Sequence, residues 1–389
     1  MKLFISASRI ADAARSAARA VHANHGRRKP ILNCCRLTAG SNLSIYGTDL
    51  DTGITAIADC DVIEPGEAVV DAHRLADIAG KLNGDVHLEV KAGDLVVKCG
   101  RSRFTLAMMS VEDYPPPLAV EDGTPTIDLT AADVMAIFDG AAAGAATDDK
   151  RIYLSGPVLF SEPTDFGRQL FAVGADSVAL SYAATTAACL DLGAGVIVHR
   201  ETCKLAADLF GKIGASLRLS KNLIELASDS VRLAAKLVDS TPSCWRSFVP
   251  PIDVTNFALV ASKDLKTALE RCFAVINNLT GDLAKRAPSI TLWWDIAAGP
   301  EVRFGFRNIK DEAPAVRDAV PPTELSGKTD ITLNPKLLQR LLDGLDADNL
   351  RLSVGDHRGD PLRIDGRADR FAVLSQMRDF SHVLEEEAA

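Results

Sequence analysis

The residue types that most often carry out chemistry are present in this chain, but their spacing matches no common catalytic motif. The seven histidines show neither H-x-x-x-H nor H-E-x-x-H spacing, and the glycines form no G-x-x-x-x-G-K-[ST], G-x-G-x-x-G or G-x-S-x-G run. Asp49 and Asp51 in GTDLD could suggest a metal site, but two carboxylates between strands are more typical of a turn. The sequence therefore favours a non-catalytic protein without cofactor or metal. An enzyme whose site is assembled from remote residues stays open as an alternative of a different class.

The elements that position the functional residues repeat along the chain. Three stretches, beginning at Asp71, His199 and Asn334, each read as an amphipathic helix, a Gly or Asp break and an alternating strand. About 130 residues separate the copies, which exceeds a solenoid repeat of roughly 20 to 50 residues, so the repeated object is a domain. An earlier helix in each third, beginning near Ser6, Thr130 and Ser262, brings the predicted number to six. Thr130 with Asp133 has the form of a capping box, and Ser6 and Ser262 are expected N-caps.

Strand signals between these helices predict antiparallel sheets. Residues 42–62, 94–110 and 222–238 each read as two strands around a polar turn. Helices followed by hairpins, without β-α-β alternation, indicate α+β domains. Proline clusters in YPPPL and FVPP place the domain boundaries, which gives domains at residues 1–122, 123–250 and 251–389, the last with a short acidic tail. The pair Pro321 and Pro322 is interpreted as a loop.

Composition excludes some classes of protein and leaves others open. Hydrophobic residues make up 47% of the 389 residues, enough for real cores, whereas aromatic residues make up only 5%. No apolar run approaches the roughly 20 residues of a membrane span, and the N-terminus does not resemble a signal peptide, so we expect a cytoplasmic protein. The eight cysteines are scattered and predict free thiols. A net charge of -9 argues against a protein that coats nucleic acid, but it allows a local basic face.

The order of the segments resembles the bacterial DNA polymerase III β subunit, or sliding clamp, family. The resemblance rests on KPILNCCRL, GTDLDTGI and GRSRFTLAMMSVEDYP in the first third, RIYLSGPVLF, VIVHRE and KLVDSTPSCWRSFVP in the second, and ITLNPKLLQRLLDGL and FAVLSQMR in the last. It implies three copies of a DNA-clamp domain, each with two helices packed on antiparallel sheets. Two chains would then join head to tail as a homodimeric ring around duplex DNA, with twelve helices lining the hole. Such a processivity factor would bind the DNA polymerase and clamp-loader subunits through short peptide motifs.

A ring of this kind needs only weak, sequence-independent phosphate contacts along its lining. Five of the six predicted helices carry at least two basic residues. The predicted DNA-binding residues, which include a loop and the end of the third helix, are Arg15, Arg19, Arg27, Arg28, Lys29, Arg74, Lys81, Lys150, Arg200, Lys204, Lys263, Lys266, Lys336 and Arg340. Each of them could also be an ordinary solvated residue. The third helix, TAADVMAIFDGAAAGAA, has no Lys or Arg, so we expect weaker and more salt-sensitive retention on DNA than a typical clamp shows.

The resemblance also implies an interface between the two chains. Phe104 and Leu106 of the first-domain hairpin would meet a patch made of Phe273, Ala274, Val275 and Ile276 in the last third of the partner chain. Pairing would cover an otherwise open strand edge. The alternative interpretation is that Phe104 and Leu106 point into the core of their own hairpin.

A pocket for partner peptides is implied between the second and third domains. The matching residues are Leu154, Ala175, Ser177, Val178, Leu180, Ser243, Ser247, Phe248, Val373, Leu374, Ser375, Met377 and Arg378. The family's T-D-G-H-R-L run corresponds here to ADSVAL, so the apolar character is kept and the polar rim is changed. This change favours a second reading, a divergent paralogue that serves a dedicated repair, plasmid or phage polymerase. The tail after Arg378 could compete for the pocket through Phe380 or Leu384.

Overall fold

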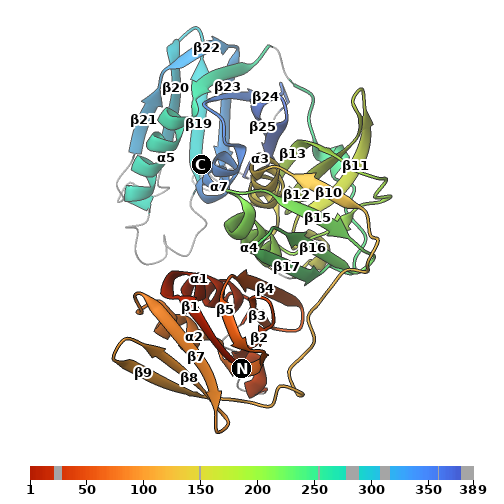
Figure 1. The fold of residues 1–389 in the computed structure, drawn as a ribbon. Helices are drawn as coiled ribbons and strands as arrows, with labels where there is room; N and C mark the ends of the chain where they lie inside the picture. Colours follow the sequence, from red (N-terminus) through yellow and green to blue (C-terminus); the bar gives the residue numbers. More distant parts are fainter. Residues whose placement is uncertain are drawn as a thin grey trace. The chain divides into compact units, whose positions relative to one another are not determined.

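The computed structural model describes residues 1–21, 29–148, 150–252, 255–276, 289–306, 316–357 and 359–377. The chain divides into two compact units, which are described separately (Figure 1). Unit 1 comprises Met1–Val134 and Glu201–Asp239, and unit 2 comprises Met135–Arg200 and Ser240–Ala389. None of the helices described is long and apolar enough to cross a membrane.

All six predicted helices are present. They are α1 (Ala7–Ala18), α2 (Ala72–Ala79), α3 (Ala131–Met135), α4 (Arg200–Phe210), α5 (Ser262–Ile276) and α7 (Pro335–Leu345). The third helix continues beyond α3 as a π-helical turn, η3 (Ala136–Gly140), and a 3₁₀ turn, η4 (Ala141–Gly144).

The helix caps agree with the sequence only in part. Thr130 and Asp133 form the predicted capping box, because the Asp133 N–H donates to the Thr130 hydroxyl at 3.1 Å and the Thr130 N–H donates to the Asp133 carboxylate at 3.0 Å. Ser6 precedes α1 but makes no capping hydrogen bond, and Ser262 is already the first residue of α5. Asn334 caps α7 by accepting from two backbone N–H groups.

Unit 1 contains two antiparallel sheets. The five-stranded sheet has the order β5 (Asp61–Glu64), β1 (Lys2–Ser6), β7 (Asp85–Lys91), β8 (Asp94–Cys99) and β9 (Ser102–Ala107). The eight-stranded sheet has the order β10 (Thr126–Leu129), β15 (Ala215–Leu219), β16 (Leu223–Ala227), β17 (Val231–Lys236), β4 (Thr52–Ala58), β3 (Leu43–Thr48), β2 (Cys34–Ala39) and β6 (Gly66–Asp71). The β17–β4 pair therefore joins strands of the predicted first and second domains.

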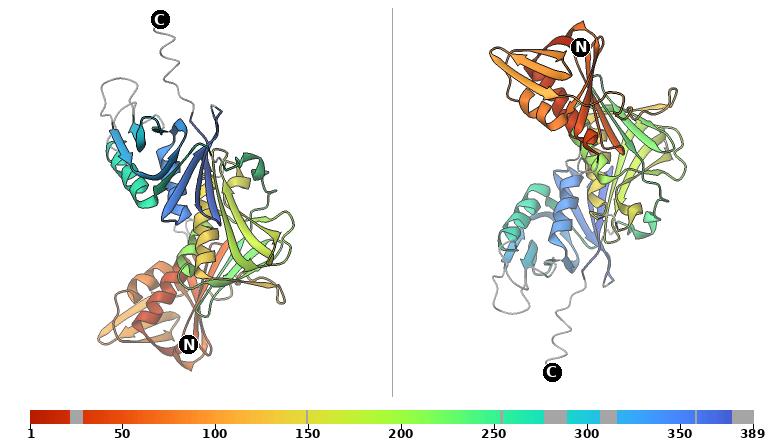
Figure 2. Two further views of the ribbon diagram at one scale, coloured as in Figure 1. Left: turned by 90° about the horizontal axis from the view of Figure 1, so that it is seen from above. Right: turned by 90° about the horizontal axis from the view of Figure 1, so that it is seen from below.

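Unit 2 also contains two antiparallel sheets. The nine-stranded sheet has the order β14 (Val196–Ile197), β11 (Val158–Thr164), β12 (Gly167–Ala175), β13 (Ala179–Ala188), β26 (Arg370–Leu374), β25 (Leu362–Arg367), β24 (Asn349–Val354), β18 (Phe257–Ala261) and β22 (Pro322–Ser326). The four-stranded sheet has the order β21 (Val316–Val320), β20 (Gly299–Phe306), β19 (Ile290–Asp295) and β23 (Lys328–Leu333). Figure 2 shows β11 to β13, in green, beside β24 to β26, in blue, where the β13–β26 pair joins them.

These two strand pairs explain why the compact units do not follow the repeat. The second third of the chain gives four strands to the eight-stranded sheet and four to the nine-stranded sheet, and each sheet is completed by another third. The fold is the predicted α+β class with antiparallel pairing. The boundaries near residues 122 and 250 stay a prediction.

Alanine allows helix α1 to lie close to the sheet beneath it. Five alanines of α1 are at most 5% exposed, and together with Ile10 they pack in the apolar core of unit 1. A Cβ added to Gly47 on β3 would stand 2.2 Å from the Ala17 carbonyl oxygen, so the position accepts only glycine. Alanine, and not an aromatic residue, therefore fills the interface between α1 and the sheet, in keeping with the low aromatic content of the chain.

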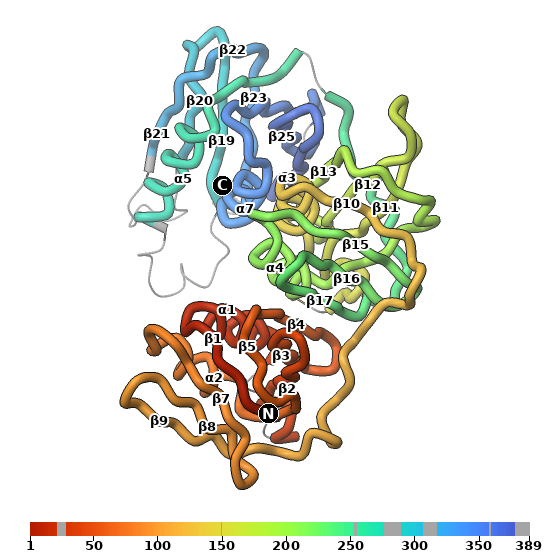
Figure 3. Tube along the Cα trace, viewed as in Figure 1, coloured from red at the N-terminus to blue at the C-terminus, as the bar shows by residue number. Residues whose placement is uncertain are grey.

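The segment between the first and second predicted domains, residues 108–125, is held by polar contacts and is called the connecting segment (Figure 3). Tyr114 is buried and donates its hydroxyl hydrogen bond to the Cys34 carbonyl oxygen at 2.8 Å. The Tyr46 hydroxyl contacts the Pro116 carbonyl at 3.4 Å and accepts from the Leu118 N–H at 3.2 Å.

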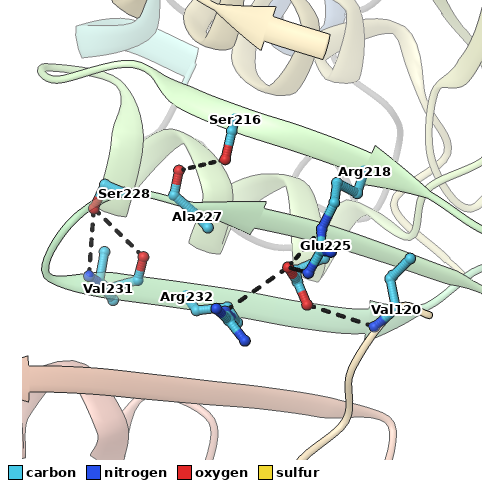
Figure 4. Close-up of polar contacts among 8 residues, drawn as sticks. All are labelled: Val120, Ser216, Arg218, Glu225, Ala227, Ser228, Val231 and Arg232. Carbon is cyan, nitrogen blue, oxygen red and sulfur yellow. Dashed lines mark hydrogen bonds and ion pairs between the residues drawn. The ribbon is translucent and has the colours of Figure 1, made fainter. Parts of the chain in front are cut away.

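The far end of the connecting segment reaches a buried carboxylate on β16 (Figure 4). Glu225 is 1% exposed and forms ion pairs with Arg218 and Arg232, and it accepts a hydrogen bond from the Val120 N–H at 3.5 Å. A buried carboxylate is tolerated only when its charge is matched and its lone pairs are occupied. Glu225 therefore links the connecting segment to three strands of the eight-stranded sheet.

Candidate nucleic-acid and partner interfaces

The predicted DNA-binding residues lie on or directly beside five helices, as the sequence suggested. Arg15 and Arg19 lie on and after α1, Arg74 and Lys81 on and after α2, Arg200 and Lys204 on α4, Lys263 and Lys266 on α5, and Lys336 and Arg340 on α7. Lys29 and Lys150 are exposed loop residues. Arg27 and Arg28 lie outside the described residues.

Five of the predicted helix-associated basic residues form ion pairs with acidic neighbours. The ion pairs are Arg15–Asp12 at 3.1 Å, Arg74–Asp71 at 3.8 Å, Lys266–Asp343 and Arg340–Asp176 at 3.2 Å each, and a close Arg19–Asp208 contact. Sequence reasoning counted the cations alone, because which acid lies opposite each cation depends on the fold. These five positions offer less attraction to phosphate than that count predicted.

Four lysines remain as the strongest candidates for phosphate contact. Lys81, Lys204, Lys263 and Lys336 are exposed, and no carboxylate of the described chain lies within ion-pair distance of their ammonium groups. A flexible ammonium group can contact phosphate without fixing a register, which suits sequence-independent binding.

The absence of Lys and Arg from the third helix has a packing reason. Residues of η3 and η4 are mostly buried, and their small side chains allow close approach of backbone on two sides. A Cβ on Gly144 would stand 2.3 Å from both the Gly174 carbonyl oxygen and the Ser181 nitrogen, and a Cβ on Gly344 of α7 would stand 2.9 Å from the Gly140 oxygen. The buried positions of this helix are therefore held between β12–β13 and α7, where a Lys or Arg side chain has no room.

The predicted pocket residues gather at the junction of β13 and β26. Leu180 lies opposite Val373, and the Ser375 N–H donates to the Val178 carbonyl oxygen at 2.7 Å. Leu154, in the 3₁₀ turn Ile152–Leu154, lies near them, because Arg151 at the same turn donates to the Asp176 carbonyl oxygen at 3.3 Å. Ala175 ends β12, whereas Arg378 lies outside the described residues.

The residues predicted from the chain before the third domain lie on the 3₁₀ turn Trp245–Phe248 and just before it. Its tryptophan packs on aromatic rings of the nine-stranded sheet, with centroids 5.5 Å from Phe160 and 5.8 Å from Tyr182. Tyr182 in turn stacks on Phe371 at 4.8 Å. This places Ser243 and Ser247 over the sheet. Sequence reasoning missed this aromatic cluster, although the alternating positions of Phe160, Tyr182 and Phe371 on strands were a signal for it.

Two details change the predicted pocket. Leu374 is fully buried in the apolar core of unit 2, and Val373 and Leu180 are only 4% and 3% exposed, so these side chains offer little surface to a peptide. Ser177, at the glycine position of the family's run, has a φ of +78°, a left-handed conformation that disfavours every residue except glycine. Val178 and Phe248 are 45% and 61% exposed, so the apolar surface of the pocket lies there.

The predicted dimer residues lie at one sheet edge and one helix end. β9 is the outer strand of the five-stranded sheet, where Phe104 is half-buried and Leu106 packs in its own core. Phe273 is also buried, whereas Ala274 is exposed and Val275 half-buried; Ile276 ends α5. A cavity of about 460 Å³ between α5 and α7 is lined by Phe273, Ala274, Glu270, Lys336 and Gln339. The inward interpretation therefore holds for Leu106 and in part for Phe104, which is half-buried and packs against the same core.

An ion pair fixes α5 against β21, the outer strand of the four-stranded sheet. The Arg271 Nε donates to the Asp318 carboxylate at 2.5 Å, and this hydrogen bond holds the pKa of Asp318 below its usual value. The outer strands β9 and β21 thus carry or lie next to predicted interface residues within their own units.

Parts of the sequence are similar to known proteins. The family model described as DNA polymerase III beta subunit, N-terminal domain, matches residues 1–119. The beta sliding clamp of Pseudomonas aeruginosa is 35% identical over 136 residues, which cover 33% of this chain and 36% of the relative. The first third of the chain is therefore similar in sequence to DNA polymerase III beta subunits. The beta sliding clamp of Caulobacter vibrioides extends the match to 230 residues at 29% identity, covering 57% of this chain and 61% of the relative.

Solved structures extend the likeness of fold to nearly the whole chain. A Caulobacter crescentus beta sliding clamp has a TM-score of 0.82 at 23% identity and covers 97% of this chain and 99% of its own. The beta subunit from DNA polymerase of Streptococcus pyogenes has a TM-score of 0.85 at 16% identity, over 97% of this chain and all of its own. The sequence match to the first relatives spans only about a third of their length, whereas the fold is that of a sliding clamp throughout.

Proposed function

We propose that the protein is a DNA sliding clamp, a non-catalytic processivity factor that encircles duplex DNA and tethers a polymerase to it. The observation that carries this proposal is the fold, which repeats two helices and antiparallel sheets three times and matches solved sliding clamps over 97% of the chain. Exposed lysines on four helix-associated positions support sequence-independent contact with phosphate.

Ring closure would use the outer strands β9 and β21 of the five-stranded and four-stranded sheets. The β17–β4 and β13–β26 pairs already join strands of neighbouring domains within the chain, which gives sheets of eight and nine strands. Pairing of β9 with β21 of a second copy would give another nine-stranded sheet. Two such junctions would close a two-fold ring and cover the β9 and β21 edges of both copies.

Topological binding can be tested directly. The protein, loaded by a clamp loader onto nicked circular DNA, is expected to stay bound through gel filtration and to be released when a restriction enzyme linearises the circle. Equal retention on circular and linear DNA would reject the proposal. Because acidic partners neutralise five basic residues, we expect retention to be lost at lower salt than for the Pseudomonas aeruginosa clamp in the same assay.

The dimer edge can be tested with single substitutions. Phe104→Asp on β9 and, separately, Ala274→Arg at the end of α5 should each convert dimer to monomer in multi-angle light scattering, because each places a charge in the proposed junction. Leu106 is left intact, since a charge there would disrupt its own core. A dimer that persists in both variants would refute this interface.

A second candidate is a paralogue that forms the same ring but serves a dedicated repair, plasmid or phage polymerase. Ser177 with its φ of +78° and the exposed Val178 favour it, because they change the rim where partner peptides are expected to dock. A clamp that is released on linearisation but does not bind the C-terminal peptide of the host's replicative polymerase would support the paralogue. Tight binding of that peptide would support the general clamp.

A further inference from the structure

Asp176 organises the turn that carries the exposed rim of the pocket. One carboxylate oxygen accepts from the Val178 N–H at 3.1 Å and from the Ala179 N–H at 2.7 Å, while the Asp176 N–H donates to the Ala179 carbonyl oxygen at 2.9 Å. These bonds close the β12–β13 hairpin and hold Ser177 in its left-handed conformation. They use only one of the two carboxylate oxygens.

The second carboxylate oxygen of Asp176 contacts Arg340 of α7, which is 164 residues away in the sequence. Arg340 Nη2 donates to Asp176 Oδ2 at 3.2 Å, and the side chains of the pair are only 25% and 12% exposed. Arg340 Nε is buried and has no hydrogen-bond partner within the described chain. The Arg340 guanidinium group thus binds the turn through Nη2, while its Nε–H stays without a hydrogen bond within the described chain.

Among the described residues, the remaining contacts of α7 with this region are apolar and backbone packing. Leu338, Leu341 and Leu342 of α7 pack in the apolar core, and Gly344 lies against the backbone of η3. Apolar and backbone packing fixes the distance between α7 and the sheet, but it does not fix the turn at the end of β12. The Asp176–Arg340 ion pair is the directional contact from α7 to this turn, and it adds to the Arg151 hydrogen bond to the Asp176 carbonyl oxygen.

The position of this turn decides the shape of the predicted pocket. The Val178 carbonyl oxygen accepts from the Ser375 N–H, and Leu180, two residues further, lies opposite Val373. A turn that frays would move Val178 and disturb the β13–β26 junction beside it.

We propose that Arg340 is a positioning residue of the partner-peptide pocket, which it acts on through Asp176, and not a DNA-contacting residue. This inference rests on the proposed function for the identity of the ligand, an apolar-anchored peptide of a polymerase tail. It replaces the DNA-binding role that the sequence predicted for Arg340. Lys336, one turn earlier on the same helix, is exposed and keeps that role.

Four variants of the full-length protein test the proposal: Arg340→Gln, Asp176→Asn, the double variant, and Lys336→Gln as the matched control on α7. Asp176→Asn keeps an oxygen for the two backbone N–H groups and removes the charge that Arg340 needs. A fluorescein-labelled C-terminal peptide of the host's replicative polymerase serves as the probe in fluorescence anisotropy. Retention on nicked circular DNA is measured in parallel.

Arg340→Gln and Asp176→Asn should each weaken peptide binding about tenfold, the scale of one charge-assisted hydrogen bond. The double variant should be no weaker than either single variant, because both remove the same contact. Lys336→Gln should shorten DNA retention and leave peptide affinity unchanged. Arg340→Gln with normal peptide affinity and shortened DNA retention would overturn the proposal.

Amide hydrogen exchange separates this inference from the proposed function. The Val178 and Ala179 amides should exchange about tenfold faster in Arg340→Gln than in the wild type, with or without any peptide. If the wild-type protein binds neither peptide nor DNA, the proposed function fails, but the exchange rates still test the ion pair. Unchanged protection at both amides would overturn the positioning role by itself.

Discussion

Glu225 gives the most informative test of how unit 1 is held together. Replacing it with alanine removes a carboxylate that is 1% exposed and leaves the cationic side chain of Arg218, 20% exposed, without its partner. Breaking a buried ion pair costs about 3 to 5 kcal/mol. Arg232 is half exposed and adds at most about 1 kcal/mol. Because Arg218 keeps a fifth of its surface in water, we expect the lower end, about 3 kcal/mol.

The assay must report on unit 1. All three tryptophans, Trp245, Trp293 and Trp294, lie in unit 2, so intrinsic fluorescence does not follow the region around Glu225. Hydrogen exchange of residues 223–236 does, and about 3 kcal/mol corresponds to a loss of protection of roughly a hundredfold. The connecting segment should also become more sensitive to protease, because the Val120 N–H loses its acceptor.

Two control variants sharpen the test. Arg232→Ala should reduce protection by less than about fivefold, since an exposed pair contributes little. Glu225→Leu with Arg218→Met should recover most of the stability, because it removes both charges together. A less than threefold change in Glu225→Ala would refute the reasoning and show that solvent already compensates Arg218.

Three further predictions concern other parts of the chain. Gly144→Ala should destabilise unit 2 by about 3 kcal/mol, because its Cβ would overlap two backbone atoms, whereas Gly40→Ala, with nothing within 4 Å, should leave the circular-dichroism melting temperature unchanged. Arg271 lowers the pKa of Asp318, so the wild type should be more stable than Asp318→Asn, with the whole difference in unfolding free energy present above about pH 4. The difference should disappear as the pH falls through the lowered pKa. Urea titrations at several pH values that show no such loss would contradict this prediction. Ser177→Gly should stabilise the protein by about 0.5 to 1 kcal/mol in urea denaturation, since glycine relieves the left-handed strain, and a destabilised variant would show that Ser177 makes a compensating contact.

The sequence by itself determined the class of fold, the six helices and the hairpins at residues 42–62, 94–110 and 222–238. These are local properties: period 3.6 or 2 in hydrophobicity, and caps such as Thr130 with Asp133, act between residues that are neighbours in the chain. The repeat of about 130 residues also needs no structure to be seen, because duplication leaves the same pattern at each copy. The basic residues on helices could be found in the same way.

Only the tertiary structure decided which of those basic residues are free of acidic neighbours within the described chain and exposed enough to contact phosphate. Whether a cation can bind phosphate depends on the acid beside it, and the acid is often distant in sequence, as Asp208 is from Arg19 and Asp176 from Arg340. Likewise, period 2 places Val373 and Leu374 on opposite faces of a strand, but it does not say that both faces are covered, which leaves the two side chains 4% and 0% exposed. Pair formation and burial are set by contacts between remote segments, so they become known only when the chain is folded.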